Sequence, residues 1–149
     1  MPNLTRLLSG AAVVFVAALS LVAPGVSQDR VAQDQDAKVT RGKYLAEEVA
    51  RCQDCHTPRL ITGEYVKAGW FKGTTLEFAP VSPMPGWHQK TPDISSTSAL
   101  WGRWGDDGMV AFLETAKNPR GGKAGPPMPA YTMSHEDAVA VAAYLKSLK

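Results

Sequence analysis

The sequence predicts an all-α domain whose first and last helices cross, with a long loop rich in proline and glycine between them. Three observations predict this arrangement. Apolar residues recur at intervals of three and four near both ends of residues 39–149, as they do on the buried face of a helix. The stretch that follows residue 57 holds many prolines and glycines and little helical periodicity. The motif Cys52-Gln53-Asp54-Cys55-His56 lies where the first helical pattern ends.

The motif has the Cys-x-x-Cys-His spacing that serves for covalent attachment of c-type haem. On a helix, Cys52 and Cys55 lie three residues apart and project from neighbouring points of one face. Two thioethers at this spacing can reach the two vinyl groups along one side of a porphyrin. The imidazole of His56 follows directly and can ligate the iron. The chain has only these two cysteines, so the motif predicts one covalent haem c, bound through Cys52, Cys55 and His56.

Two alternatives stay open, because a Cys-x-x-Cys pair also occurs in thioredoxin-like redox sites and in zinc sites. A redox dithiol is expected at the start of a helix after a strand, whereas here a helical pattern runs into the motif from upstream. A zinc site needs two more Cys or His ligands at close spacing, and only His88 and His135 remain, each alone. Both are predicted to be surface or turn histidines. The haem interpretation is favoured.

Residues 1–27 are predicted to be a signal peptide or an uncleaved membrane anchor. Arg6 precedes an apolar run, which is followed by Pro24, Gly25 and a small-residue cleavage point at Val26-Ser27. Cleavage is favoured, although residues 7–26 are about long enough to span a bilayer. Either form predicts export, and therefore a periplasmic protein that is soluble or tethered to the membrane.

The polar residues 28–38 are predicted to be a flexible linker, because they offer almost nothing to bury. Residues 39–149 are expected to form one domain, which is an ordinary domain size. The formal charge of the whole chain is +2, and no basic stripe suggests nucleic acid binding.

Three helices are expected in this domain. The first begins near Thr40, a plausible N-cap, and is stopped by Pro58. Its buried stripe runs into the haem motif and consists of Gly42, Leu45, Val49, Cys52 and His56. A middle helix is expected from about Asp106-Asp107, whose charges suit a helix N-terminus, to Pro119. Its buried face consists of Met109, Phe112, Leu113 and Ala116.

The last helix is predicted to begin with a capping box formed by Ser134 and Asp137. Its apolar face consists of Ala138, Val141, Ala142, Leu145 and Leu148. Gly42 and the alanines would let the first and last helices cross closely, with Tyr44 and Tyr144 as packing partners. In the loop that precedes the middle helix, only residues 74–78 have the character of a strand. A buried haem would supply the surface on which so long a loop packs.

The preferred sixth ligand of the iron is Met128, in the segment Gly125-Pro126-Pro127-Met128-Pro129. The flanking prolines restrict the backbone and would hold the thioether at the iron. Met84, which lies between Pro83 and Pro85, is the second candidate. Met109 lies on a helical core stripe, and Met133 lies next to an N-cap.

Charged residues outside the motif predict little chemistry. Glu47-Glu48 and Asp106-Asp107 are interpreted as solvated helix charges, and no acid–base pair or activated nucleophile is found. Four lysines are candidates for a ring that steers an acidic partner: Lys67, Lys72, Lys90 and Lys123.

Over residues 40–148, the chain resembles the class I cytochrome c family. The resemblance rests on the first helix with Gly42 and Tyr44, on Cys52-x-x-Cys55-His56, on Pro127-Met128-Pro129 and on the aromatic-bearing last helix. Short segments also look like the cytochrome modules of bacterial periplasmic dehydrogenases: Thr91-Pro92-Asp93-Ile94, Trp104-Gly105-Asp106 and Met128-Pro129-Ala130-Tyr131. The resemblance implies a class I cytochrome c fold, with the haem enclosed by helices and the long loop. It also implies a proline carbonyl that holds the axial histidine, and the choice among the prolines stays open.

The function expected is one-electron transfer by a mono-haem protein that is not itself an enzyme. A haem iron saturated by His56 and Met128 has no open position for oxygen or peroxide chemistry. The expected partners are other redox proteins, such as a dehydrogenase, an oxidase or a respiratory complex. Two alternatives stay open. The chain could be the haem-bearing subunit of a membrane dehydrogenase or respiratory complex, or a haem-based sensor of small ligands.

Overall fold

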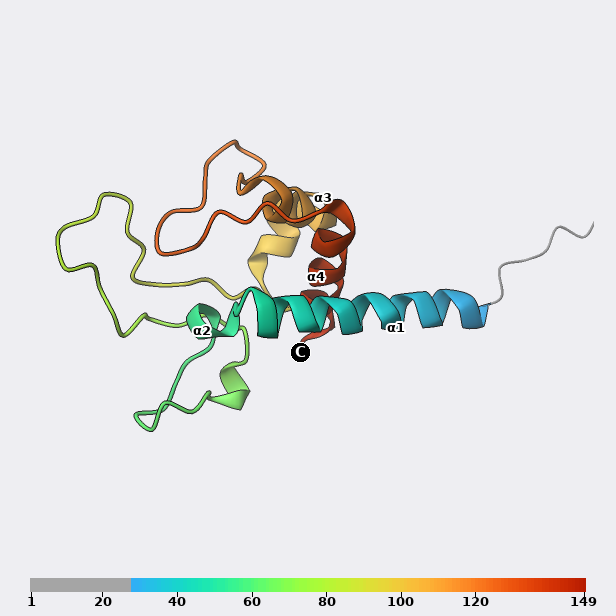
Figure 1. Cartoon of the computed structure of the whole chain (residues 1–149), viewed down its shortest axis with the longest axis horizontal. Helices are drawn as coiled ribbons and strands as arrows, with labels where there is room; N and C mark the ends of the chain where they lie inside the picture. The colour runs from blue at the N-terminus through green and yellow to red at the C-terminus, as the bar shows by residue number, and fades with distance from the viewer. Residues whose placement is uncertain (1–27) are drawn as a thin grey trace, which may run out of the picture.

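The structure is a computed structural model that describes residues 28–149. The elements in chain order are α1 (Gln28–Tyr44), the π-helical turn η1 (Leu45–Val49), α2 (Gln53–His56), the 3-10 turn η2 (Lys67–Gly69), α3 (Ala99–Thr115) and α4 (His135–Ser147). Helices α1, α3 and α4 form one half of the domain, and long loops form the other (Figure 1). Within the described residues, β-structure is limited to isolated bridges. This confirms the all-α prediction.

Helices α1 and α4 cross at Gly42, as the sequence predicts. A Cβ atom on Gly42 would lie 2.5 Å from the carbonyl carbon of Ala140 and 2.8 Å from the Cβ of Tyr144. Only a residue without a side chain therefore allows this approach. Tyr144 is buried at the crossing, but Tyr44 is 52% exposed and lies under the guanidinium of Arg41. The prediction of Tyr44 as a packing partner is wrong.

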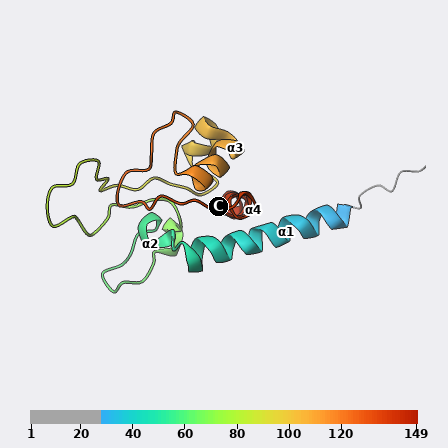
Figure 2. The ribbon, with the colours of Figure 1, turned by 45° about the horizontal axis from the view of Figure 1, so that its top comes forward.

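The structure corrects the prediction that residues 28–38 form a flexible linker, because α1 begins at Gln28 and Thr40 lies inside it. These residues include no glycine or proline, and a helix nucleated by packing at its C-terminal end extends readily through them. Lys38 and Asp34 form an i,i+4 ion pair of 2.6 Å along the helix. Residues 28–37 are exposed, and the first turns of α1 reach beyond the rest of the domain in both views (Figures 1 and 2).

The π turn η1 changes which residues of the first helical segment face the core. A π turn holds one residue more than an α turn, so the regular spacing of three and four fails there. Leu45, Ala46 and Glu47 are buried, whereas Val49 is 59% exposed. The predicted stripe is therefore correct for Gly42, Leu45 and His56 and wrong for Val49. Glu47 is also not the solvated charge that the sequence predicted.

Helix α3 begins seven residues earlier than predicted, with the hydroxyl of Ser98 as its N-cap. It bends at Gly105, where φ is +67°, so the predicted start at Asp106 corresponds to its second segment. Met109, Leu113 and Ala116 are buried as expected. In α4 the Ser134 hydroxyl accepts a hydrogen bond from the Asp137 amide at 3.3 Å, which confirms Ser134 as the N-cap. The reciprocal half of the predicted capping box is not formed, because the Asp137 carboxylate accepts from Arg41 at 3.0 Å instead.

The core gathers around α4, where α1, η1 and α3 meet. Its buried members include Leu45, Phe71, Ile94, Leu100, Met109, Leu113, Val141, Tyr144 and Leu145. The predicted strand at residues 74–78 is reduced to an isolated bridge between Thr75 and Lys90. Among residues 28–149, no helix is long and apolar enough to cross a membrane. The predicted signal peptide or anchor over residues 1–27 lies outside the described residues.

Candidate haem-binding site

The motif Cys52–His56 forms a tight helical turn at the end of the first helical segment. Arg51 has φ +50°, which interrupts the helical backbone between η1 and α2. The Cys52 carbonyl accepts hydrogen bonds from the amides of Cys55 at 3.2 Å and His56 at 2.9 Å. Neither cysteine forms a disulfide. The turn therefore presents two free thiols and an imidazole from neighbouring positions.

His56 is buried and is held by a carbonyl from a distant part of the loop. Its Nδ1–H donates a hydrogen bond of 2.8 Å to the Pro92 carbonyl. A carbonyl can only accept, so the proton of the neutral ring sits on Nδ1 and the lone pair of Nε2 is free for a metal. Burial lowers the pKa of His56, although the Pro92 carbonyl opposes this shift. The ring is thus in the tautomer that iron ligation requires, and Pro92 is the proline that the sequence could not identify.

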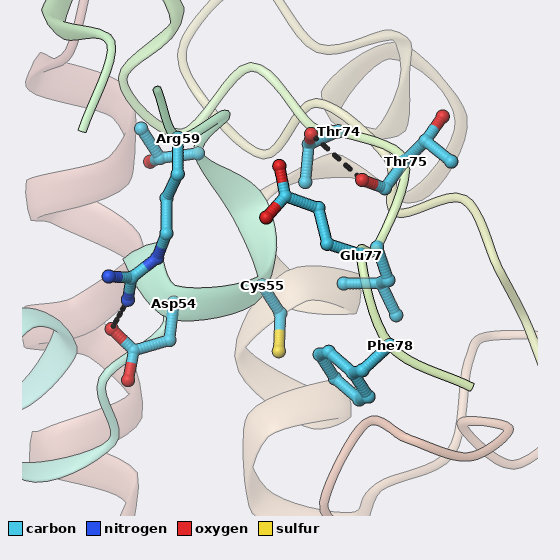
Figure 3. Close-up of a pocket in the computed structure, with 9 residues that line it drawn as sticks. Asp54, Cys55, Arg59, Thr74, Thr75, Glu77 and Phe78 are labelled. Carbon is cyan, nitrogen blue, oxygen red and sulfur yellow. Dashed lines mark hydrogen bonds and ion pairs between the residues drawn. The ribbon is translucent and has the colours of Figure 1, made fainter. Parts of the chain in front are cut away.

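Both cysteines are partly buried. Burial raises the pKa of Cys52 to about 11, and burial also raises the pKa of Cys55. Cys55 lines a cavity of about 400 Å³ together with Leu76 and Phe78. Figure 3 shows the Cys55 sulfur pointing toward the ring of Phe78. Leu76 and Phe78 form the apolar part of this cavity, whereas its other lining residues besides Cys55 are polar or charged.

A cluster of polar side chains closes the loop that follows the motif. Asp54 accepts hydrogen bonds from Arg51 at 2.9 Å, from Arg59 at 3.0 Å and from the Tyr65 hydroxyl. Burial alone would raise the pKa of Asp54, but the hydrogen bond from Arg51 and the other two partners lower it. The guanidinium of Arg59 also lies 4.2 Å from the centre of the Tyr65 ring. The cluster fastens residues 59–65 to α2. Figure 3 shows the contact between Arg59 and Asp54, next to Cys55.

Met128 lies half-buried in a segment that is fastened at two points. The Pro126 carbonyl accepts a hydrogen bond of 2.8 Å from the His88 amide, and a Cβ atom on Gly125 would lie 2.8 Å from the Gly86 carbonyl oxygen. The Tyr131 hydroxyl donates a hydrogen bond of 2.9 Å to the Ala50 carbonyl, two residues before Cys52. The methionine segment is therefore tied to the attachment turn.

The other candidate residues lie elsewhere. Met84 is 47% exposed in the loop, and Met109 is a core residue as predicted. His88 and His135 are exposed, and His135 Nδ1 lies 2.7 Å from a Glu114 carboxylate oxygen. The four lysines proposed for a steering ring are all exposed: Lys67, Lys72, Lys90 and Lys123.

Sequence reasoning missed the side-chain partners of the site. Thr91 donates to the Cys55 carbonyl at 2.6 Å, and Tyr131 donates to the Ala50 carbonyl. Both residues lie in segments that look like dehydrogenase cytochrome modules, but nothing in the sequence specifies the carbonyl that each one binds. Nothing in the sequence around Glu47 indicates that Tyr144, which is 97 residues away, would bury its carboxylate.

The residues present fit a c-type haem. A neutral, buried imidazole with Nε2 free, two uncombined thiols one turn apart and a thioether on a fastened segment make up the donor set of a covalently attached, axially ligated haem. Such a haem supplies one-electron chemistry at its iron. In this chain Cys52 and Cys55 would attach the haem, and His56 and Met128 would be its axial ligands.

Comparison with known proteins agrees with this fit. Residues 39–149 match the family model described as cytochrome c. The chain is 35% identical over 120 residues to the cytochrome c subunit of alcohol dehydrogenase (quinone) from Gluconobacter oxydans, covering 76% of this chain and 24% of that protein. It is 30% identical over 131 residues to the gluconate 2-dehydrogenase cytochrome c subunit of Pantoea cypripedii, covering 85% and 30%.

A third relative is a diheme cytochrome c-type protein of Cereibacter sphaeroides, 32% identical over 111 residues, covering 71% of this chain and 34% of that protein. The chain thus spans about a quarter to a third of the length of these relatives. The family match over residues 39–149 agrees with the all-α fold and with the attachment turn at Cys52–His56. The chain belongs to the cytochrome c family and is a haem-bearing electron-transfer protein.

Proposed function

We propose that the chain is an exported, periplasmic cytochrome c that carries single electrons through one haem, with His56 and Met128 as axial ligands. The observation that carries the proposal is the hydrogen bond of 2.8 Å from His56 Nδ1–H to the Pro92 carbonyl. It leaves Nε2 as the free donor of a buried ring whose orientation is fixed. A hydrogen bond of this kind also raises the basicity of a ligating histidine.

A single haem follows from the cysteine content. The whole sequence has two cysteines, both in the motif, so it can form two thioether bonds and no more. The relative named as a diheme protein is about three times as long as the aligned region, and its second haem has no counterpart among the cysteines of this chain.

Met128 is the preferred distal ligand. The Tyr131 hydroxyl ties the methionine segment to Ala50, and the His88 amide ties it to the loop. Because both ends of the segment are fastened, the Met128 thioether has few positions open to it, which favours a stable bond to iron. Met84 lacks such a setting, since it is exposed in the loop.

Periplasmic location is supported by the sequence of residues 1–27, which has the pattern of an export signal or anchor. The attachment motif agrees with it, because covalent haem attachment in bacteria occurs on the exported side of the membrane.

A second candidate function is that of a haem-bearing subunit in a membrane-associated dehydrogenase. The relatives favour it, since two of them are named as cytochrome c subunits of dehydrogenases. In this role the cytochrome would pass electrons from a catalytic subunit to a further acceptor. Co-purification of the tagged chain from native membranes distinguishes the two. A dehydrogenase that stays bound through size-exclusion chromatography indicates the subunit, and a monomeric cytochrome indicates the free carrier.

The proposal is tested by purifying the chain from a host with haem attachment machinery. The intact mass should exceed that of the cleaved polypeptide by one haem, and the haem should stay with the protein after extraction with acidified organic solvent. Cys52→Ala and Cys55→Ala should each leave one thioether bond, and the double variant should release all of its haem. Haem that passes into the organic phase from the unmodified protein would overturn the proposal.

A further inference from the structure

We propose that Thr91 is a positioning residue for the axial histidine, and that its hydroxyl group helps set the reduction potential of the protein. The inference rests on the proposed ligation of a haem iron by His56. It extends that site to a side chain that acts on the ligand through the Pro92 carbonyl.

The Thr91 hydroxyl joins two backbone groups from different parts of the chain. It donates a hydrogen bond of 2.6 Å to the Cys55 carbonyl and accepts one of 2.9 Å from the Thr74 amide. The Thr74 carbonyl lies farther away, at 3.2 Å, and a hydroxyl has one hydrogen to give. The hydroxyl hydrogen of Thr91 is therefore donated to the nearer acceptor, the Cys55 carbonyl. The carbonyl of Cys55 lies in the last turn of α2, where the helix itself offers no partner.

The backbone of Thr91 is fixed by the neighbouring segment. Its amide donates to the Thr74 carbonyl at 2.9 Å, and the Leu76 amide donates to the Gln89 carbonyl at 2.8 Å. Thr75 and Lys90 form the isolated bridge between these two contacts. Thr91 is thus the last residue of a short antiparallel pairing, and the next carbonyl along the chain is the one that holds His56.

Gly73 supports the Pro92 peptide from the other side. Its amide donates to the His56 carbonyl at 2.8 Å, and a Cβ atom on it would lie 2.7 Å from the Pro92 carbonyl carbon and 2.9 Å from the Asp93 nitrogen. The segment beyond is held as well, because the Asp93 carboxylate accepts from the amide and the hydroxyl of Ser95, both at 2.7 Å. The Pro92 carbonyl consequently has little freedom to move away from the imidazole.

The consequence concerns the strength of the hydrogen bond from His56 Nδ1–H. A carbonyl held in place keeps this bond short and makes the imidazole a stronger donor to iron, which favours Fe(III). Without the Thr91 hydroxyl, the Cys55 carbonyl and the Thr74 amide lose their shared partner. The segment that carries Pro92 is then held by fewer contacts and can shift slightly, which weakens the bond and favours Fe(II).

The test compares Thr91→Val, which keeps the shape and removes the hydroxyl, with Thr91→Ser, which keeps the hydroxyl. Thr91→Ala removes the hydroxyl without placing a methyl group against the Cys55 carbonyl, and gives a second measurement if the valine variant yields no folded protein. Thr40→Val, at an exposed threonine on α1, is the matched control. All are studied as the full chain with its haem attached.

Two quantities are measured well below the unfolding temperature. Redox titration should show that Thr91→Val and Thr91→Ala shift the equilibrium toward the reduced form by a factor of about three to ten, where tenfold corresponds to about 59 mV. In the reduced, diamagnetic protein, proton NMR should show faster solvent exchange of the His56 Nδ1 proton. Thr91→Ser and Thr40→Val should match the unmodified protein in both.

The outcomes separate this inference from the proposed function. A normal haem content with an unchanged potential and an unchanged Nδ1 proton in Thr91→Val and Thr91→Ala would overturn the role of Thr91 and leave the haem site intact. A shift of equal size in Thr91→Ser would overturn it too, because the hydroxyl would then not be the cause. Absence of covalent haem from the unmodified protein would instead refute the proposed function.

Discussion

The hydroxyl of Tyr144 on α4 donates a hydrogen bond to the buried carboxylate of Glu47 in the π turn η1. Lys43 pairs with the same carboxylate, and the indole of Trp70 donates to the Tyr144 oxygen at 3.4 Å. Three elements therefore meet at one ionised group. Burial alone would raise the pKa of Glu47, but the hydrogen bonds from Lys43 and Tyr144 lower it below its usual value.

This pairing predicts a pH dependence of stability. Because the pKa of Glu47 is lower in the folded protein than in the unfolded chain, its contribution is complete above the unfolded pKa and is lost as the pH falls through the folded value. Glu47→Gln should reduce the free energy of unfolding at pH 7 by about 1–3 kcal/mol. The difference from the unmodified protein should shrink on acidification to about pH 3. Denaturant titrations at several pH values measure it, and a difference that is constant with pH would contradict the assignment.

Gly42→Ala should strongly destabilise the crossing of α1 and α4. The new Cβ would overlap the Ala140 carbonyl group, so the helices must separate, which we expect to cost about 3 kcal/mol or more. Gly102→Ala is the matched control, because its Cβ would meet no atom within 4 Å. That control should leave the melting temperature unchanged or raise it slightly. Calorimetry of the two holo variants provides the measurement, and equal effects would exclude a tight crossing.

Met128→Ala should remove the weak sulfur-to-iron charge-transfer band in the far red of the oxidised protein. It should also lower the reduction potential, because a thioether favours Fe(II). Met84→Ala serves as the control and should preserve both properties. If Met84→Ala abolishes the band while Met128→Ala keeps it, the distal ligand is Met84.

Carbon monoxide distinguishes an electron carrier from a ligand sensor. With both axial positions filled, the reduced protein at neutral pH should show almost no spectral change under carbon monoxide. Met128→Ala should bind the gas readily, since the substitution opens a coordination position. Rapid stoichiometric binding by the unmodified protein would support the sensor.

Tyr131→Phe should loosen the methionine segment without removing any ligand. The variant loses the hydrogen bond of 2.9 Å to the Ala50 carbonyl, and we expect a loss of about 1 kcal/mol in unfolding free energy. The far-red band should disappear at a lower temperature than in the unmodified protein, ahead of global unfolding. Parallel absorbance and circular dichroism melts test this, and coincident shifts in both melts would show that Tyr131 acts on the whole fold.

The parts of the fold that the sequence predicts well are those fixed by local spacing. Gly42 and Ala138 follow helical periodicity, Ser134 is a recognisable cap, and Cys52–His56 is a contiguous motif. Each of these can be recognised within one or two helical turns. The prediction that Val49 is buried failed because the regular period breaks at η1, and nothing in the local sequence marks a π turn.

The contacts that complete the site could not be predicted, because they join residues far apart in the chain. Pro92 lies 36 residues from His56, and Tyr131 lies 81 residues from Ala50. With 11 prolines in the sequence, spacing alone cannot select the one whose carbonyl faces the imidazole. The burial of Glu47 depends in the same way on Tyr144, which lies 97 residues later in the sequence, on α4.

The exposed turns of α1 have a mechanical consequence. From Gln28 to the crossing at Gly42 the helix advances by about 1.5 Å per residue, a total of about 21 Å. A flexible linker of the same length would let the domain turn in any direction. A continuous helix instead fixes both a distance and an angle. The start of α1 at Gln28 is thus held at a set separation from the attachment turn.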